Sequence, residues 1–293
     1  MDKDAALLVE ESELGGRRPK GWSRHLLFGL GVAWSLFQLW ATELGTLDPI
    51  RLRAVHLAFA LALAFLAYPG KRGPKDRVPL LDWALALLGA LGALYVVWDY
   101  YGITQIRGGI PSDRDVVMGT LTLLVLFVAS WRVVGPALPI IASVFILYAL
   151  TGPKGLIPYT LPSWLQLHAG SQWGQLMGQL YTTAEGIWGV PLGVSATFVF
   201  LFVLFGALLD KAGAGHFFIQ AAYALLGHFR GGPAKAAVVA SALTGVVSGS
   251  SVSNTVTTGT FTISGIIRKK GSLIRAAAAS GEDCDRISAP CPM

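Results

Sequence analysis

The sequence predicts an all-α integral membrane protein with about six transmembrane helices, further helices lying at the membrane interface, and one re-entrant helical hairpin. Two observations support this prediction. Of the 293 residues, 53% are hydrophobic and only 14% are charged, whereas soluble domains carry about 25% charged residues. The hydrophobic residues are also concentrated in runs that approach the ~20 residues a helix needs to cross a bilayer.

Six such runs are separated by polar, Gly-containing or Pro-containing segments. The region 116–150 is too long for one span. It is interrupted at Arg132, Gly135, Pro136 and Pro139, so we expect two antiparallel helices joined by a tight turn. The predicted spans are 25–42, 52–68, 79–98, 116–131, 133–150 and 191–209.

The distribution of Lys and Arg predicts the orientation. Segments 1–24, 69–78 and 210–235, together with the turn at Arg132, hold 13 of these residues, and the alternate loops hold 5. The positive-inside rule therefore places the N-terminal segment 1–24 in the cytoplasm. The net charge of +6 is thus read as a topology signal, and no motif for nucleic-acid binding accompanies it.

Two segments outside the spans are expected to lie at the membrane interface. The amphipathic segment 215–232 is one of them. The other is 151–190, because aromatic side chains favour the boundary between lipid and water. Its aromatic residues include Trp164, Trp173, Tyr181 and Trp188.

Several charged residues receive structural interpretations. Asp82 and Asp99 bracket the third span and are expected in the headgroup region, and Glu185 is expected to be an interfacial carboxylate. Arg132 is read as an anchor of the cytoplasmic turn. The five histidines are scattered without the spacing of metal ligands.

The sequence offers nothing for an enzyme and no cofactor site. Cys284 and Cys291 both lie in the last ten residues, which excludes a disulfide framework, and no zinc-binding spacing occurs. Paired catalytic carboxylates, a nucleophile elbow, a phosphate loop and an HExxH motif are all missing from the sequence.

A re-entrant hairpin is predicted over 234–263. The apolar run AKAAVVASALTGVV, 234–247, is too short to cross a bilayer, and it breaks into SGSSVSN. The chain then returns to the basic cluster Arg268-Lys269-Lys270, so it enters and leaves on the cytoplasmic side. Irregular backbone at membrane depth is tolerated only where protein or a water-filled cavity surrounds it.

The break in this hairpin has the composition of an ion site. Gly249 allows tight backbone geometry, and Ser250, Ser253, Asn254 and Thr255 supply neutral oxygens. Freed carbonyls and hydroxyls can ligate Na⁺, while N–H groups at a half-helix N-terminus face an anion.

The same small residues also permit close helix packing, as in the Gly245-x-x-x-Gly249 pattern. From the spacing alone, an ion site and a packing role both remain open.

Three stretches carry a family resemblance: RVVGPALPII (132–141), EGIWGVPLGVSATFVFLFVLFGALLDKAGAGHFF (185–218) and HFRGGPAKAAVVASALTGVVSGSSVSNTVTTGTFTI (228–263). They resemble the fused permeases of tripartite ATP-independent periplasmic (TRAP) transporters, most closely the TAXI type. The similarity covers roughly residues 20–263.

The resemblance implies secondary uptake of an organic anion, such as a carboxylate, across the bacterial inner membrane. An ion gradient, usually of Na⁺, drives this uptake, and a periplasmic substrate-binding protein delivers the substrate. By similarity to the hairpin tips of related elevator transporters, Ser253 and Asn254 would ligate the ion, with Gly249 and Ser250 as further candidates. Asn254 and Thr255 would face the substrate carboxylate.

The resemblance also divides the chain. After the N-terminal segment 1–24, residues 25–150 correspond to the small membrane subunit, and 151–263 begin the large transport subunit. The tail 264–293 is charged and does not resemble the family. We therefore expect a C-terminally truncated and inactive permease fragment. The alternatives are one half of a split permease and a membrane scaffold that does not transport.

Overall fold

A computed structural model describes residues 16–17, 19, 21–43, 45, 47–70, 73–74, 76–158, 162, 164, 167–229 and 232–247. The chain divides into two compact units: Gly15–Phe202, and a second unit that includes the described residues from Val203 onward. Within the described ranges every regular element is helical, apart from one isolated bridge between Thr151 and Ile157. This confirms the all-α prediction.

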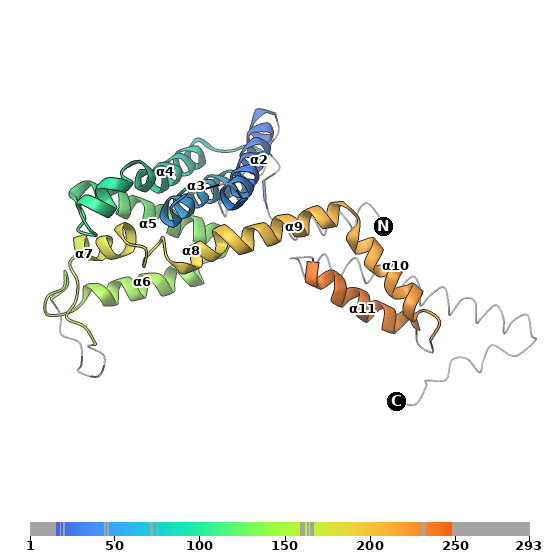
Figure 1. Ribbon diagram of the computed structural model, residues 1–293. Helices are drawn as coiled ribbons and strands as arrows, with labels where there is room; N and C mark the ends of the chain where they lie inside the picture. The colour runs from blue at the N-terminus through green and yellow to red at the C-terminus, as the bar shows by residue number, and fades with distance from the viewer. Residues whose placement is uncertain are drawn as a thin grey trace, which may run out of the picture. The chain divides into compact units, whose positions relative to one another are not determined.

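The first unit begins with four long helices: α2 (Trp22–Glu43), α3 (Pro49–Ala67), α4 (Leu80–Trp98) and α5 (Asp113–Val133). A π-helical turn, η1 (Gly102–Ile106), lies between α4 and α5, and α6 (Ala137–Leu150) follows. Short elements come next: α7 (Trp173–Met177), η2 (Gly178–Thr182), α8 (Val190–Val194) and η3 (Ser195–Val199). Figure 1 shows these elements in chain order.

Five helices in the described ranges are long and apolar enough to span a bilayer: α2, α3, α4, α5 and the continuous run Val190–Leu209 through α8, η3 and α9 (Phe200–Lys211). Each lies within one helical turn of a predicted span. The chain is therefore a multi-pass integral membrane protein.

The remaining predicted span, 133–150, is shorter than expected. The helix α5 continues to Val133, Gly135 adopts φ +109°, and α6 starts only at Ala137, after Pro136. Its 14 residues extend ~21 Å, which is less than the ~30 Å hydrocarbon core. The turn around Gly135 and Pro136 is not helical, so the helix that follows it is too short for a full span.

Helix α3 lies at the centre of the first unit and contacts α2, α4, α5 and α8 (Figure 1). Its mostly apolar side chains are buried on several faces. They include Ala54, Leu57, Ala58, Leu61 and Phe65. Since a spanning helix gains nothing from hiding apolar surface from lipid, close packing with its neighbours holds it in place.

Two glycines bring α4 close to its neighbours. A Cβ at Gly92 would lie 2.2 Å from Oγ1 of Thr122 on α5. A Cβ at Gly89 would lie 3.0 Å from Val125 and 3.1 Å from Leu61. Glycine at these positions lets the helices approach more closely than any side chain would permit.

The segment between α6 and α8 differs from the predicted interfacial helix. The described residues of this segment form two short helices, α7 and η2, and its aromatic residues have different environments. Trp164 is exposed, but Tyr181 and Trp188 are fully buried. The Tyr181 hydroxyl donates to the carbonyl of Gly92 at 2.5 Å, and Trp188 Nε1 donates to the Tyr181 carbonyl at 2.6 Å. These two residues belong to the core because their polar atoms find backbone partners there.

The second unit contains the end of α9, then α10 (Ala214–Leu226) and α11 (Gly232–Val247). The segment 215–232, expected to lie at the membrane interface, forms most of α10, which packs against α11 through Ile219, Ala222, Ala236 and Ala240. In this unit α10 and α11 form a helical pair.

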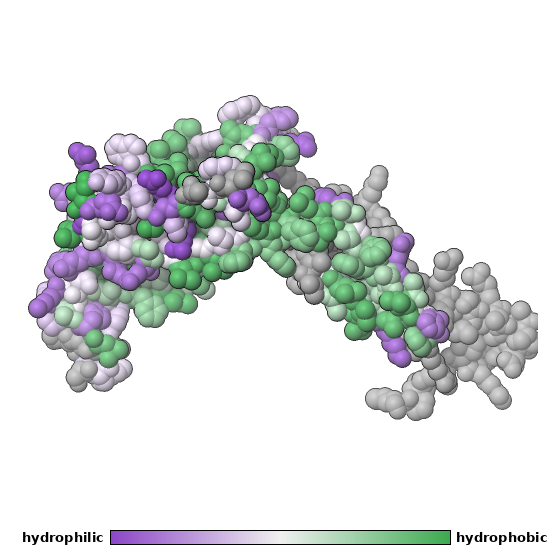
Figure 2. Space-filling view, viewed as in Figure 1, coloured by the Kyte–Doolittle hydropathy of each residue, from purple (hydrophilic) through white to green (hydrophobic). Residues whose placement is uncertain are grey.

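Large apolar side chains are exposed over the outer faces of the long helices, as expected for surfaces that contact lipid. Figure 2 shows hydrophobic residues at the surface of both units. Examples are Phe28 on α2, Leu87 on α4, Leu124 on α5, Phe145 on α6 and Phe202 on α9.

Candidate functional site

The predicted ion-site and substrate-site residues all lie outside the described part of the chain. These are Gly249, Ser250, Ser253, Asn254 and Thr255, together with the rest of the hairpin beyond Val247 and the tail 264–293. Of the predicted hairpin, the structure describes the first arm, which is α11. It also describes the elements from α2 to α10.

Helix α11 uses small residues to pack on α10. Ala236, Ala240 and Thr244 recur every four residues and are buried on one face, as expected for positions that share a helix face. The opposite side is exposed at Val238, where the exposed fraction is 71%. The part of α11 before the break therefore has a packing face.

The hydroxyl of Thr244 is engaged by its own helix. It donates to the carbonyl of Ala240 at 2.8 Å and lies 3.2 Å from that of Ser241. Such back-bonding satisfies a polar side chain without any ligand. Gly245, the next residue, is exposed and does not line the contact with α10. Thr244 lies before the polar stretch 248–262, so both interpretations of that stretch stay predictions.

The first unit contains a buried ion-pair cluster where α4 starts and α5 ends. Oδ1 of Asp82 accepts from Arg132 Nη1 at 2.6 Å, and Oδ2 of Asp82 pairs with Arg17 Nη2. Arg17 is fully buried and also donates to the carbonyls of Phe65 and Pro74. Asp82 is 3% exposed and bridges two cations, and its expected level in the headgroup region stays a prediction.

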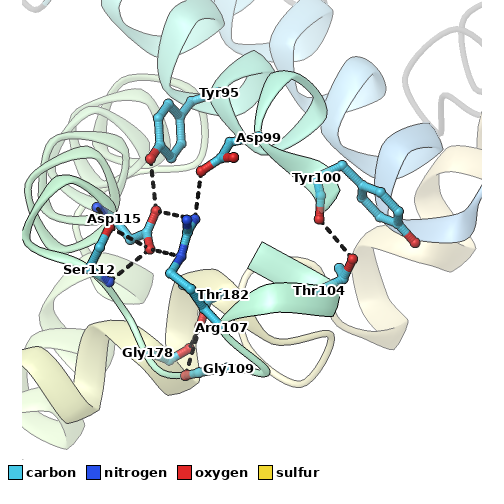
Figure 3. Close-up of polar contacts among 10 residues, drawn as sticks. All are labelled: Tyr95, Asp99, Tyr100, Thr104, Arg107, Gly109, Ser112, Asp115, Gly178 and Thr182. Carbon is cyan, nitrogen blue, oxygen red and sulfur yellow. Dashed lines mark hydrogen bonds and ion pairs between the residues drawn. The ribbon is translucent and has the colours of Figure 1, made fainter. Parts of the chain in front are cut away.

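A second cluster lies where α4 ends and α5 begins (Figure 3). Arg107 contacts the buried Asp115 through Nε at 3.0 Å and through Nη2 at 3.1 Å, and Nη2 also contacts Asp99 at 2.6 Å. Asp115 accepts further hydrogen bonds from the Tyr95 hydroxyl at 2.8 Å and the Ser112 hydroxyl at 2.9 Å. This arrangement saturates the Asp115 carboxylate.

Near the end of α4 and the start of α5, the surroundings of Arg107 and Tyr100 keep each of these side chains in one protonation state. The hydrogen bond to Asp99 raises the pKa of Arg107, so the guanidinium stays charged. A hydrogen bond to Asp48 raises the pKa of Tyr100, so the phenol stays neutral. The guanidinium of Arg51 also lies 4.2 Å above the Tyr100 ring. Neither Arg107 nor Tyr100 is suited to exchange a proton near neutral pH.

A third polar group ties α2 and α3 to η3. Gln38 is fully buried and donates through Nε2 to the carbonyl of Ala196. Nδ1 of His56 lies 3.1 Å from Oε1 of Gln38 and 3.2 Å from Nε1 of Trp34, and Nε2 lies 3.4 Å from Ser195 Oγ. Buried polar groups in a membrane helix need such partners. The group therefore joins three elements.

Sequence reasoning did not single out Arg17 or Gln38, and it gave His56 no role. A signal was present for Gln38, which interrupts an apolar run, because polar residues within transmembrane segments mark buried partners. No comparable signal marks Arg17, whose partners lie 48 to 65 residues away.

These clusters bind protein groups to one another and do not form a metal site. Among the described residues, no group of three or more His, Cys, Asp and Glu side chains could hold a metal ion. Glu185 is exposed, and its carboxylate accepts from Gln179 at 2.6 Å.

Comparison with known proteins identifies the family. Residues 121–280, more than half of the chain, match the family model of the tripartite ATP-independent periplasmic transporter, DctM component. The match extends from within α5 through α6–α11 and across the polar stretch of the predicted hairpin. No curated protein and no solved structure matches the chain. The chain belongs to the DctM component family of the tripartite ATP-independent periplasmic transporters, and it is a transporter component of the permease type rather than an enzyme.

Proposed function

We propose that this chain is a permease component of the TAXI type, with small-subunit-like and large-subunit-like parts in one polypeptide. It takes part in uptake of an organic anion, such as a carboxylate, driven by a Na⁺ gradient and fed by a periplasmic substrate-binding protein. The observation that carries this proposal is the family match over 121–280, which includes the whole polar stretch 248–262.

The ion and the substrate would bind at that stretch. The oxygens of Gly249, Ser250, Ser253 and Asn254 are neutral ligands of the hard type that Na⁺ accepts. Asn254 and Thr255 would hold the substrate carboxylate, with assistance from backbone N–H groups of the second half-helix. A site without a fixed negative charge suits an ion that has to be released in every cycle.

The unit α2–α8 would be the static part. Its buried charges are engaged with one another at Asp82 and at Asp115, and Gln38 joins α2 to η3. Interactions of this kind favour one arrangement of helices over alternatives. The placement of 1–24 in the cytoplasm, from the Lys and Arg distribution, puts the cluster of Arg107 on the periplasmic side, where a binding protein docks.

Transport in proteoliposomes tests this proposal. The full chain is reconstituted, substrate-loaded binding protein is added outside, and uptake is measured under Na⁺, K⁺ or proton gradients. Uptake under a Na⁺ gradient alone supports the proposal, whereas no uptake under any gradient supports the inactive fragment expected from the sequence. Asn254→Ala and Ser253→Ala should remove uptake, whereas the matched control Ser251→Ala should retain it. Uptake that is indifferent to Na⁺, or lost equally in Ser251→Ala, contradicts the assignment.

The back-bonded Thr244 favours a second candidate function, a membrane scaffold or one half of a split permease. In a scaffold the helix would continue through 234–265 with its hydroxyls back-bonded. Hydrogen exchange over 248–262 separates the two: a scaffold gives continuous protection, and a transport hairpin gives a fast-exchanging break whose protection increases with Na⁺.

A further inference from the structure

A groove of about 820 Å³ lies between the end of α5 and the facing side of α6. Phe127 and Trp131 on α5 and Val144 and Leu147 on α6 contribute apolar walls. Arg132 lies in the wall at one end, and it is the single charged residue among the described residues that line the groove. An apolar channel that ends at a cation has the chemical form of a phospholipid site.

The short length of α6 opens this groove to the bilayer. Its 14 residues reach only ~21 Å, so it does not span the ~30 Å hydrocarbon core by itself. Val144 is 59% and Leu147 55% exposed. Hydrocarbon must therefore fill the space beside them, because water at this depth would leave apolar surface hydrated.

The charge at the end of the groove is unbalanced. Among the residues that the structure describes, Arg17 and Arg132 share one carboxylate, that of Asp82, so these three side chains carry a formal excess of one positive charge. The side chain of Arg132 is only 13% exposed. A buried cation without a counter-ion is costly. The segment 69–78, which carries four Lys and Arg residues, adjoins this end of the groove at Pro69 and Gly70.

Arg132 is held in place but has free hydrogen-bonding capacity. Among the described residues it donates one hydrogen bond, to Asp82, and its guanidinium carbon lies 5.1 Å from the Phe65 ring centroid. Gly70 leaves room beside it, since a Cβ there would lie 3.7 Å from that carbon. A guanidinium has five N–H donors and binds phosphate oxygens in a fork geometry.

We propose that the groove binds one anionic phospholipid, with an acyl chain between α5 and α6 and the phosphate on Arg132. The lipid phosphate supplies the missing negative charge of the Arg17–Asp82–Arg132 cluster. Its acyl chain completes the hydrophobic thickness that α6 lacks. This inference does not depend on the transported substrate or on Na⁺ coupling.

The full chain, extracted in mild detergent after reconstitution with equal phosphatidylglycerol and phosphatidylcholine, is analysed by native mass spectrometry. We expect one phosphatidylglycerol retained in preference to phosphatidylcholine. In Arg132→Gln the preference should fall roughly fivefold, the loss expected for one basic residue at an anionic surface. In this variant Asp82 keeps its pair with Arg17. Arg114→Gln, an exposed arginine at the other end of α5 and outside the groove, is the matched control and should retain the preference.

A second variant tests the acyl part without touching the charges. Val144→Trp fills the groove and should abolish retention, whereas Leu87→Trp, an equally exposed position on α4, should not. Equal retention of both lipids, or an unchanged preference in Arg132→Gln, overturns the proposal. The proposal is also overturned if Val144→Cys cross-links to a second copy or to another segment of this chain while no lipid is retained.

Discussion

Asp82 on α4 and Arg132 on α5 form an ion pair of 2.6 Å although they are 50 residues apart, and a second arginine, Arg17, holds the other oxygen of the same carboxylate. This cluster joins the start of α4 to the end of α5 and to the chain before α2. At the other ends of the same two helices, Arg107 joins Asp99 and Asp115. The α4–α5 pair is therefore fastened at both ends by charges and in the middle by glycine-mediated contact.

Removing the shared carboxylate should be strongly destabilising. In Asp82→Asn two arginines lose the carboxylate with which both pair in the described part of the chain, and the Arg17 side chain is fully buried. We expect a loss of about 3–5 kcal/mol, as for other buried ion pairs broken from one side. Thermal unfolding in detergent, followed by circular dichroism, measures this loss. Asp76→Asn, at an exposed carboxylate, is the control and should unfold like the parent; equal melting of the two variants would show that the cluster contributes nothing.

The glycine contact between α4 and α5 should tolerate no side chain. In Gly92→Ala the new Cβ would overlap Oγ1 of Thr122, and such overpacking costs about 1–3 kcal/mol. Gly29→Ala on α2 is a matched control because nothing lies within 4 Å of its Cβ position. That variant should be neutral or slightly stabilised, since alanine favours a helix by about 1 kcal/mol over glycine. Destabilisation of both variants to the same extent would rule out the steric explanation.

Arg107→Lys should reveal the fork geometry of the second cluster. The guanidinium contacts Asp115 through two nitrogens and Asp99 through one of them, whereas a lysine ammonium is a single point charge. We expect a lower melting temperature for the variant at pH 7, with Arg114→Lys, an exposed neighbour, unchanged.

The same variant should also acquire a pH dependence. Because the pKa of Arg107 is raised, its contribution persists at every pH below the ordinary pKa of arginine, which lies far above neutral pH. The parent should therefore keep this pair between pH 7 and 10. Lysine starts from a pKa of about 10.4, so the contribution in Arg107→Lys should decline at lower pH than in the parent. If the melting temperatures of the parent and of Arg107→Lys change in parallel with pH, this explanation is wrong.

The helical pair of α10 and α11 should depend on small side chains at their contact. Ala240 is 1% exposed and faces α10, so Ala240→Leu should separate the helices and cost about 1–3 kcal/mol. Val238→Leu, on the exposed side, should have no such effect. Hydrogen exchange of the backbone amides in 214–247 measures whether the two helices separate. Unchanged protection of these amides in Ala240→Leu would argue against the contact between α10 and α11.

Thr244→Val tests the packing role of the last polar residue in the described part of α11. Valine matches threonine in shape and loses only a hydroxyl that donates to the helix itself. We expect hydrogen exchange of α10 and α11 to stay as in the parent. A clear loss of protection from hydrogen exchange would mean that the Thr244 hydroxyl has a role beyond its hydrogen bond to the Ala240 carbonyl.

The sequence by itself determined the class of the protein and most of its helix positions. Runs of apolar residues locate α2, α3, α4, α5 and the α8–α9 helix to within one turn, because the thickness of the bilayer dictates their length. Three stretches, within 132–141, 185–218 and 228–263, resemble the TRAP permeases, and the family match over 121–280 confirms that family. The residues proposed to bind ion and substrate, from Gly249 to Thr255, come from the sequence alone and remain predictions.

The tertiary structure decided which polar residues meet. The sequence predicts a level in the membrane for Asp82, Tyr181 and Trp188, but only the structure shows that all three are buried among protein groups. Composition reports how polar a side chain is, but not which backbone carbonyl or distant arginine lies beside it after folding. Pairs such as Arg17 with Asp82 arise only when separate helix ends are brought together, and the cost of burying an unpaired charge then makes that arrangement specific.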